Sequence, residues 1–338
     1  QGDERYFLPL GVLAEEQGGA SLPQQLALAR VRRERHVGML TDAFSLDSFA
    51  HLVFDLIGKE ARIAAEDGVI VCSRTRALDD IALPEEAGIR RMTVEQSNSS
   101  LSMDDTVVLK VIRHLTAGIH PELEMGRVLT ERGYQNAPLM LGDMTRIAAD
   151  GTPHTLIVLQ RFIHSQGDAW RWTLDTLART AQQNDDTGTG TPAMADMADP
   201  IIDLLHFAEK LGTRLAELHT VLAQPCDDPA FAPERASEAD CRHLAEQIRA
   251  QLAHAFLVLR EHESDSNEIR DMAARLQLLK GGLESLIDKL SASAVGTLRT
   301  RIHGDLHLGQ ILVSSGDVYL VDFEGEPART LEERREKN

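Results

Sequence analysis

The stretch RIHGDLHLGQ, from Arg301 to Gln310, places His303, Asp305 and His307 at alternate positions. Glycines stand between them and after them, and an amide side chain closes the stretch. Ionisable groups crowded into a short loop add little to stability, because each must stay hydrated or find a partner. Such a concentration is more typical of a functional site.

The residues that follow predict a β-hairpin. Two apolar runs, ILV and VYLV, flank the turn-forming residues Ser314–Asp317, and this order is typical of a hairpin. A hairpin brings Asp305 and Gln310, which precede it, close to Asp322 and Glu324, which follow it. Two carboxylates and an amide oxygen suit Mg²⁺, which also takes water and phosphate oxygens. The sequence therefore predicts a magnesium site at Gln310, Asp322 and Glu324 that would carry a nucleotide.

One carboxylate of this loop is suited to another task. Asp305, placed beside a substrate hydroxyl, can accept the proton as the hydroxyl oxygen attacks phosphorus. Two other interpretations stay open. In one, these acids cap turns and end strands, and the histidines bond to the backbone. In the other, His303, Asp305 and His307 ligate zinc or a pair of metal ions.

Upstream, short β-branched runs separated by turn residues predict an antiparallel sheet over about residues 89–165. Within it, residues 120–133 predict a helix with proline in its first turn and glycine at its end. Lys110 lies inside the apolar run TVVLKVIRHL, where a charge needs a partner or a function. Glu124 on the helix is the candidate partner, and a lysine so held would contact the α- and β-phosphates of a nucleotide. The alternative is an edge-strand lysine and a helix glutamate that both face water.

The turn before the lysine strand, VEQSNSS, contains no glycine. Ser97, Asn98 and Ser99 still offer polar groups to phosphates, although a plain hairpin turn is the alternative. Farther along, residues 156–170 predict a connector from strand to helix whose backbone would hydrogen-bond an adenine. Residues 180–200 are polar and without period, which predicts a loop, and the next hundred residues predict packed amphipathic helices.

Composition excludes several classes of protein. The 338 residues carry a net charge of -18, which would repel phosphate backbones, so nucleic acid is not an expected partner. Three widely spaced cysteines without a C-x-x-C pair fit free thiols in a reducing cytosol. No apolar run has the length of a membrane span, and the N-terminus lacks the features of a signal peptide. We therefore expect a soluble, cytoplasmic protein with no membrane partner.

In their order along the chain, these features resemble the eukaryotic-like kinase fold of small-molecule phosphotransferases. Within that group, VEQSNSS, HPELEMGRVLTERG, LAELHT, HGDLHLGQ and DFEGEP are similar to motifs of bacterial maltokinases and span roughly residues 89–329. The resemblance implies an α+β, bilobal, protein-kinase-like fold. Its parts would be an incomplete cap subdomain at 1–88, a nucleotide-binding N-lobe at 89–165 and a mostly helical C-lobe at 166–338, truncated at its end.

The same resemblance implies an activity. Maltokinases transfer the γ-phosphoryl group of ATP to the anomeric hydroxyl of maltose with Mg²⁺ as cofactor, and they serve the route from trehalose to α-glucan. They often occur fused to a trehalose synthase, which is therefore an expected partner. In the implied roles, Asp305 is the catalytic base, Gln310 and Asp322 are the metal ligands, and Glu324 is an accessory group beside metal or sugar. Lys110 is the phosphate lysine, with Glu124 as its partner. His303 is an orienting residue, and His307 lies beside the sugar.

Two rival hypotheses accompany this interpretation. Aminoglycoside- and choline-type kinases share H-G-D followed by a metal aspartate, but they usually carry asparagine where this chain has Gln310. A non-catalytic kinase-like module of a trehalose synthase fusion is the other rival. The complete set of acids disfavours it, and the expected truncation favours it.

Overall fold

The computed structural model describes residues 4–14, 21–34, 36–92, 98–186, 198–261 and 266–337. It divides into two compact units. Residues 1–221 with 303–336 form the first, and residues 222–302 with the last two residues form the second. The boundaries expected from the sequence, after residues 88 and 165, do not coincide with this division and stay predictions.

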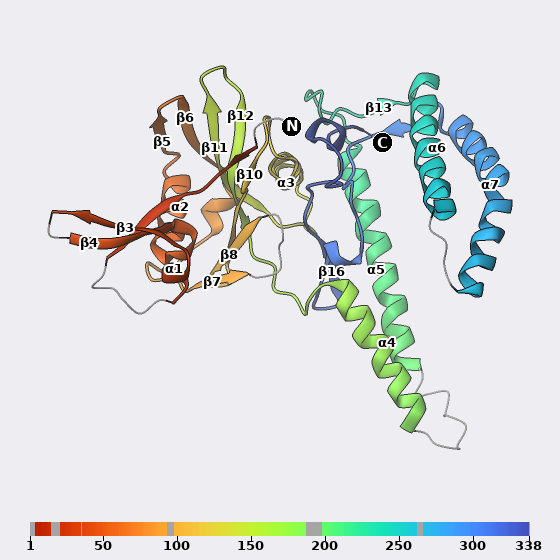
Figure 1. The fold of residues 1–338 in the computed structure, drawn as a ribbon, viewed down its shortest axis with the longest axis horizontal. Helices are drawn as coiled ribbons and strands as arrows, with labels where there is room; N and C mark the ends of the chain where they lie inside the picture. The colour runs from red at the N-terminus through yellow and green to blue at the C-terminus, as the bar shows by residue number, and fades with distance from the viewer. Residues whose placement is uncertain are drawn as a thin grey trace. The chain divides into compact units, whose positions relative to one another are not determined.

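A seven-stranded antiparallel sheet forms the centre of the first unit, in the order β5-β6-β11-β12-β9-β8-β7 (Figure 1). Its strands are β5 (Arg62–Ala65), β6 (Gly68–Arg74), β7 (Ile89–Met92), β8 (Ser99–Met103), β9 (Val107–Val111), β11 (Met140–Ala148) and β12 (Pro153–Arg161). The predicted antiparallel sheet is confirmed, but β5, β6 and β11 were not expected.

Both faces of this sheet are covered by a helix. Helix α2 (Asp47–Gly58) packs Ala50, Val53 and Ile57 into one hydrophobic cluster with the sheet. Helix α3 (Pro121–Glu131) packs on the other face, where Leu123 contacts Met140 and Val158. Because Lys110 lies directly opposite Val158 in the ladder between β9 and β12, the lysine side chain also points to the α3 face.

Smaller elements precede and flank the sheet. They are β1 (Arg5–Tyr6) paired with β10 (His114–Leu115), the three-stranded sheet of β2 (Leu10–Ala14), β4 (His36–Asp42) and β3 (Ala27–Arg33), the short helix α1 (Ser21–Gln25), and two 3₁₀ turns, Ala43–Ser45 and Arg76–Asp80. All of them belong to the first unit.

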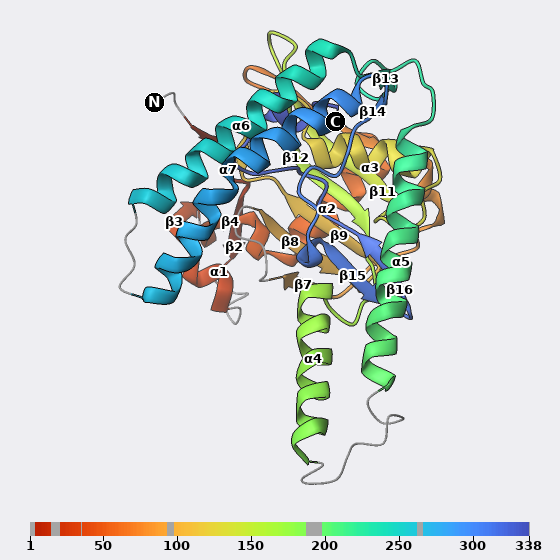
Figure 2. The ribbon, with the colours of Figure 1, turned by 90° about the vertical axis from the view of Figure 1, so that its right-hand side faces the viewer.

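Two long helices follow β12. Helices α4 (Ala169–Asp186) and α5 (Ala198–Leu222) lie side by side, with the rings of Trp172 and Phe207 5.2 Å apart (Figures 1 and 2). The loop predicted over residues 180–200 is wrong at both ends, because α4 continues to Asp186 and α5 begins at Ala198. The residues between 187 and 197 lie outside the described part of the chain.

The second unit is mainly a pair of helices, α6 (Glu238–Glu261) and α7 (Asn267–Ala294), which run side by side (Figure 2). Their apolar stripes had predicted such packing. Two short strands, β13 (Glu234–Arg235) and β14 (Leu298–Arg299), pair beside them. Among the described helices, none is both long and apolar enough to cross a membrane.

The predicted hairpin is present in the first unit. Strand β15 (Ile311–Ser314) pairs with β16 (Asp317–Leu320), and Ser315 and Gly316 form the two-residue turn between them. Both turn residues have a positive φ, of 50° and 79°, as the tight turns that suit hairpins require. The short helix α8 (Leu331–Arg334) follows the hairpin.

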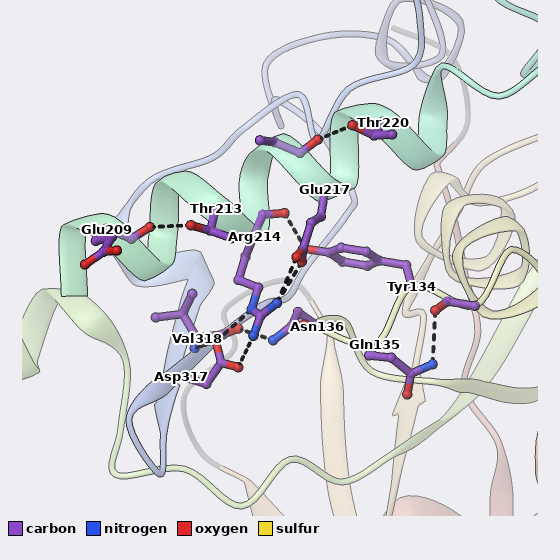
Figure 3. A network of polar contacts seen from close by, with 12 residues as sticks. Tyr134, Gln135, Asn136, Glu209, Thr213, Arg214, Glu217, Thr220, Asp317 and Val318 are labelled. Carbon is purple, nitrogen blue, oxygen red and sulfur yellow. Dashed lines mark hydrogen bonds and ion pairs between the residues drawn. The ribbon is translucent and has the colours of Figure 1, made fainter. Parts of the chain in front are cut away.

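A polar network holds the hairpin against α5 and against the loop after α3 (Figure 3). Arg214 on α5 donates two hydrogen bonds to Asp317, from Nε at 2.9 Å and from Nη2 at 2.6 Å. The carbonyl of Arg214 accepts a hydrogen bond of 2.9 Å from the Tyr134 hydroxyl. The amide of Asn136 donates to the carbonyl of Val318 at 2.9 Å. These hydrogen bonds attach the hairpin to α5 and to the residues between α3 and β11.

Candidate phosphotransfer site

Glycines bring the loops before and after the hairpin into contact. Gly304 has a φ of 88°, and a Cβ at this position would lie 3.1 Å from the Cα of Gly325, which itself has a φ of 75°. Both positions therefore favour glycine, because other residues rarely adopt this conformation and the backbones approach closely. The loop that carries Asp305 consequently lies against the segment that carries Asp322 and Glu324.

His303 fixes the start of the loop. Its side chain is buried, its ring lies 4.6 Å from the ring of Phe323, and its Nε2 lies 2.9 Å from the carbonyl oxygen of Val321. A carbonyl can only accept, so Nε2 carries the proton. Burial lowers the pKa of His303, against the smaller opposing effects of this hydrogen bond and of Asp322 and Asp305. His303 therefore contacts the backbone in a way that suits an orienting role.

His307 is exposed, and its ring folds back on its own loop. Its Nδ1 accepts a hydrogen bond of 3.0 Å from the backbone N–H of Gly309 and so caps a 3₁₀ turn over Leu308–Gln310. This contact needs glycine, because a Cβ at position 309 would lie 2.8 Å from the His307 ring. The turn delivers Gln310 to the open end of the hairpin.

The predicted approach of Gln310 to Asp322 is confirmed. The Gln310 amide donates a hydrogen bond of 2.9 Å to Oδ2 of Asp322, while Oδ1 lies 3.2 Å from Nζ of Lys110. Asp322 has a φ of 63°, a conformation that costs a residue other than glycine about 1–2 kcal/mol. Strain of this kind gathers at functional sites, where neighbouring contacts hold it in place.

Lys110 lies at the centre of a cluster of acids. It is 4% exposed, and its Nζ lies 2.9 Å from Glu122, 2.8 Å from Glu324 and 3.2 Å from Asp322. Strand β9 lies between β12 and β8 rather than at the edge of the sheet. The edge-strand alternative for Lys110 is therefore wrong. The lysine connects the sheet, the helix and the segment after the hairpin.

The helix partner of Lys110 is Glu122, and the prediction of Glu124 was wrong by two positions. Glu124 instead pairs with Arg335, with contacts of 3.0 and 2.5 Å. A signal for Glu122 was present in the sequence. Residues 122, 125, 126 and 129 form one helical stripe, and the structure buries all four.

Burial and neighbouring charges shift the pKa values of Glu122 and Glu324 in opposite directions. Burial raises the pKa of Glu122 to about 8, although Lys110 acts in the opposite direction. Burial would also raise the pKa of Glu324, but Lys110 and then His120 outweigh it and hold that pKa below its usual value. His120, which the sequence analysis did not select, has a pKa of about 4, mainly because of burial. Neutral Glu122 and ionised Glu324 are thus the favoured pair.

Two metal hypotheses can be compared with this geometry. Ligand atoms of His120, Glu122 and Glu324 lie within 4.8 Å of one another, but the Lys110 ammonium already contacts both carboxylates and supplies the positive charge. Neither loop histidine belongs to such a group in the described ranges, so the zinc hypothesis gains no support. Asp322 and Gln310, by contrast, bring a carboxylate and an amide together, which fits the oxygen ligands of Mg²⁺.

The serine-rich turn contributes one residue to the cluster. The amide of Asn98 donates a hydrogen bond of 2.7 Å to Glu324. Ser99 begins β8, and its hydroxyl accepts a hydrogen bond of 3.0 Å from Arg113. Ser97 lies outside the described residues. Asn98 is therefore placed beside the acids, and Ser99 contacts an arginine.

The connector after β12 borders a cavity of about 320 Å³. Its lining residues are Gln135, Ala137, Leu139, Arg161, Phe162, Ile163, His164, Ser314 and Tyr319. Neither Lys110 nor Asp322 is among them, so this cavity is separate from the acid cluster.

These elements define a kinase-like fold, with antiparallel strands and helix α3 around a buried lysine, followed by helices and a loop-hairpin segment rich in acids. Solved structures of glucosamine kinase share it. One of them, in complex with glucosamine, ADP and inorganic phosphate, has a TM-score of 0.63 at 19% identity. The match covers 98% of this chain and 71% of the chain in that structure. Another crystal form has a TM-score of 0.62 at 22% identity, over 92% and 68%. The predicted fold class is confirmed.

Sequence comparison also finds glucosamine kinases among the relatives of this chain. The glucosamine kinase of Mycolicibacterium smegmatis is 28% identical over 248 residues, which are 73% of this chain and 54% of the relative. That of Streptacidiphilus jiangxiensis is 26% identical over 351 residues, or 98% and 72%. The chain thus spans about half the length of the first relative. No protein-family model matches it.

Proposed function

We propose that this chain is the catalytic part of an ATP- and Mg²⁺-dependent sugar kinase. The observation that carries the proposal is the contact of buried Lys110 with Asp322, whose other carboxylate oxygen accepts a hydrogen bond from Gln310. A lysine for the phosphates and an acid-amide pair for the metal are the parts that phosphoryl transfer needs.

Each residue of the site has a proposed task. Lys110 holds the α- and β-phosphates of the nucleotide, and Glu122 holds the lysine. Gln310 and Asp322 would hold Mg²⁺, which neutralises phosphate charge and orients the γ-phosphoryl group. Glu324, tied to Lys110 and Asn98, is the accessory acid of the cluster.

Asp305 is the proposed base. The acceptor hydroxyl oxygen bonds to the γ-phosphorus as the bond from that phosphorus to the β,γ-bridging oxygen breaks. ADP leaves, and Asp305 takes the hydroxyl proton. The contacts of His303 and Gly304 hold the backbone next to Asp305, which supports this role because fixed orientation is a large part of such catalysis.

An amino sugar is the acceptor that the comparisons support, since the two relatives described above are named glucosamine kinase. Maltose, implied by the resemblance to maltokinases, and association with a trehalose synthase stay predictions. We therefore propose glucosamine as the first acceptor to test and maltose as the second.

Coupled ADP release tests the proposal directly. The acceptors are glucosamine, maltose, glucose, trehalose, choline and an aminoglycoside, each with ATP and Mg²⁺. Release that depends on glucosamine or maltose supports a sugar kinase and identifies its acceptor. Release only with choline or the aminoglycoside contradicts it, and no release despite nucleotide binding would favour a non-catalytic module.

Asp305→Asn separates chemistry from binding. It should reduce turnover by at least about a thousandfold, since a positioned base and its charge are both lost. ADP binding, measured by calorimetry, should stay within about twofold. Turnover close to that of the wild type would remove Asp305 from the role of base.

A further inference from the structure

Glu124, which does not pair with Lys110, forms an ion pair with Arg335. Glu124 is 11% exposed at its side chain and receives both Nε and Nη2 of Arg335, at 3.0 and 2.5 Å. A bidentate arginine-carboxylate pair fixes orientation as well as distance. Arg335 follows α8, more than two hundred residues after α3 in the sequence.

This pair acts on the same helix turn that supports Lys110. Glu122 and Glu124 are two residues apart, so they point about 200° from each other around α3. One is held by Lys110 on the sheet and the other by Arg335 on the C-terminal segment. The first turn of α3 is thus fixed from two opposite sides.

The segment that carries Arg335 is itself braced. Thr330 and Glu333 form a reciprocal capping box at the start of α8. Leu331 packs against Gly118, where a Cβ would lie 2.8 Å from it, and lines a small pocket together with His120 just before α3. Arg335 therefore reaches Glu124 from a defined position rather than from a free chain end.

These contacts connect the segment after the hairpin to the sheet, to α3 and back to the same segment. Asp322 and Glu324 bind Lys110, Lys110 binds Glu122, and α3 leads to Glu124. Arg335 then returns to the segment that began with Asp322. We propose that Arg335 is a positioning residue: through Glu124 it sets the place of α3, and so the place of Glu122 and Lys110 in nucleotide binding. The last step rests on the proposed kinase function.

A plain surface ion pair is the competing explanation, because the Arg335 side chain is 36% exposed. Such a pair contributes little and affects only its surroundings. The two explanations differ in what removal of the guanidinium does to α3 and to ATP. A positioning role predicts a local effect on α3 and a selective change for the nucleotide.

The test compares Arg335→Ala, Arg335→Lys and the control Arg329→Ala. Arg329 is an exposed arginine of the same segment, and its backbone hydrogen-bonds to Glu326 and Arg334. Hydrogen exchange of the α3 amides is followed in the full chain, and KM for ATP and for glucosamine are measured with kcat. A charge-reversed pair, Glu124→Arg with Arg335→Glu, tests rescue.

Arg335→Ala should raise α3 exchange by about tenfold or more over the control, without a similar rise in the other elements of the first unit. KM for ATP should rise by about tenfold while KM for glucosamine stays within about twofold. Arg335→Lys and the reversed pair should restore part of both effects.

Unchanged α3 exchange in Arg335→Ala would overturn the proposal, and so would a uniform rise across the unit. A rise in α3 exchange with an unchanged KM for ATP would overturn the link to the nucleotide. If the wild-type chain turned over none of the acceptors, the proposed kinase function would fail. Exchange in α3 and calorimetric binding of ADP would then still decide the role of Arg335.

Discussion

Replacing Lys110 with methionine removes one buried ammonium and leaves its partners in place. Glu122 and Glu324 lie 2.9 and 2.8 Å from its Nζ, and the side chains of both are mostly buried. Removing one partner of a buried ion pair costs about 3–5 kcal/mol, because an uncompensated charge stays behind. Asp322, which is 34% exposed, keeps more of its hydration. We therefore expect Lys110→Met to lower the free energy of unfolding by about 3–5 kcal/mol at pH 7.5.

The loss of unfolding free energy in Lys110→Met should be larger at pH 7.5 than at pH 5.0. Although burial acts to raise it, the pKa of Glu324 lies below its usual 4.5, because Lys110 and His120 outweigh burial. That carboxylate therefore stabilises the fold above pH 4.5, and the effect is lost as the pH falls through the folded pKa. In the variant, burial acts without Lys110, so the pKa values of Glu324 and Glu122 both rise and stability falls as the pH increases. The free energies of unfolding of the wild type and of Lys110→Met should therefore move apart between pH 5.0 and pH 7.5. The change is about 1.4 kcal/mol for each unit by which a carboxyl pKa differs between the two proteins.

Urea unfolding followed by circular dichroism at these two pH values measures the effect. Lys59→Met is the matched control, because Lys59 is 71% exposed and pairs only at the surface with Asp55. Surface pairs contribute about 0–1 kcal/mol. A loss below about 1 kcal/mol for Lys110→Met at pH 7.5, or an equal loss at both pH values, would refute the reasoning.

Three further changes test the scaffold around the site. Gly142→Ala should cost about 1–3 kcal/mol in thermal unfolding, because its Cβ would overlap Ile57 and lie 2.6 Å from a backbone carbonyl; no loss would contradict the close packing. Tyr134→Phe should cost about 0.5–1.5 kcal/mol, since it removes the donor to the Arg214 carbonyl, and a gain in stability would contradict this. Arg214→Met should raise the lowered pKa of Asp317, so the variant's loss of stability should be full above pH 4 and shrink below it. An unchanged Asp317 titration by NMR would contradict the pair.

Local chemistry made the hairpin and its acids predictable. The turn residues between β15 and β16 determine which strands pair, and pairing determines that Gln310 meets Asp322. A burial argument within one strand was likewise enough to single out Lys110. In each case the deciding interactions lie within about a dozen residues or within one element.

Contacts between distant segments were not predictable in the same way. The helical stripe of residues 122, 125, 126 and 129 pointed to Glu122, but that this stripe faces Lys110 follows only from the packing of α3, in which Leu123 contacts Met140 and Val158. Arg335 had no local signal at all, since its partner lies in another element. The strand β11 was missed because its sequence, MLGDMTRIA, contains few β-branched residues.

The distribution of charge in the cluster leads to a final prediction. One ammonium faces three carboxylates, and burial raises the pKa of Glu122 to about 8 while Glu324 stays ionised. The proton therefore belongs on Glu122, where a hydrogen bond to Glu324 also helps to lower the pKa of the latter. Glutamine has the same shape as the protonated acid and can make the same donation.

Glu122→Gln should consequently cost no more than about 1 kcal/mol at pH 7.5, the scale of one neutral hydrogen bond. That is far less than expected for Lys110→Met, although the two side chains touch. Thermal unfolding of both variants, alone and combined, measures the difference. Similar large losses for the two single variants would mean that Glu122 is ionised in the fold and that Lys110 holds three charges rather than two.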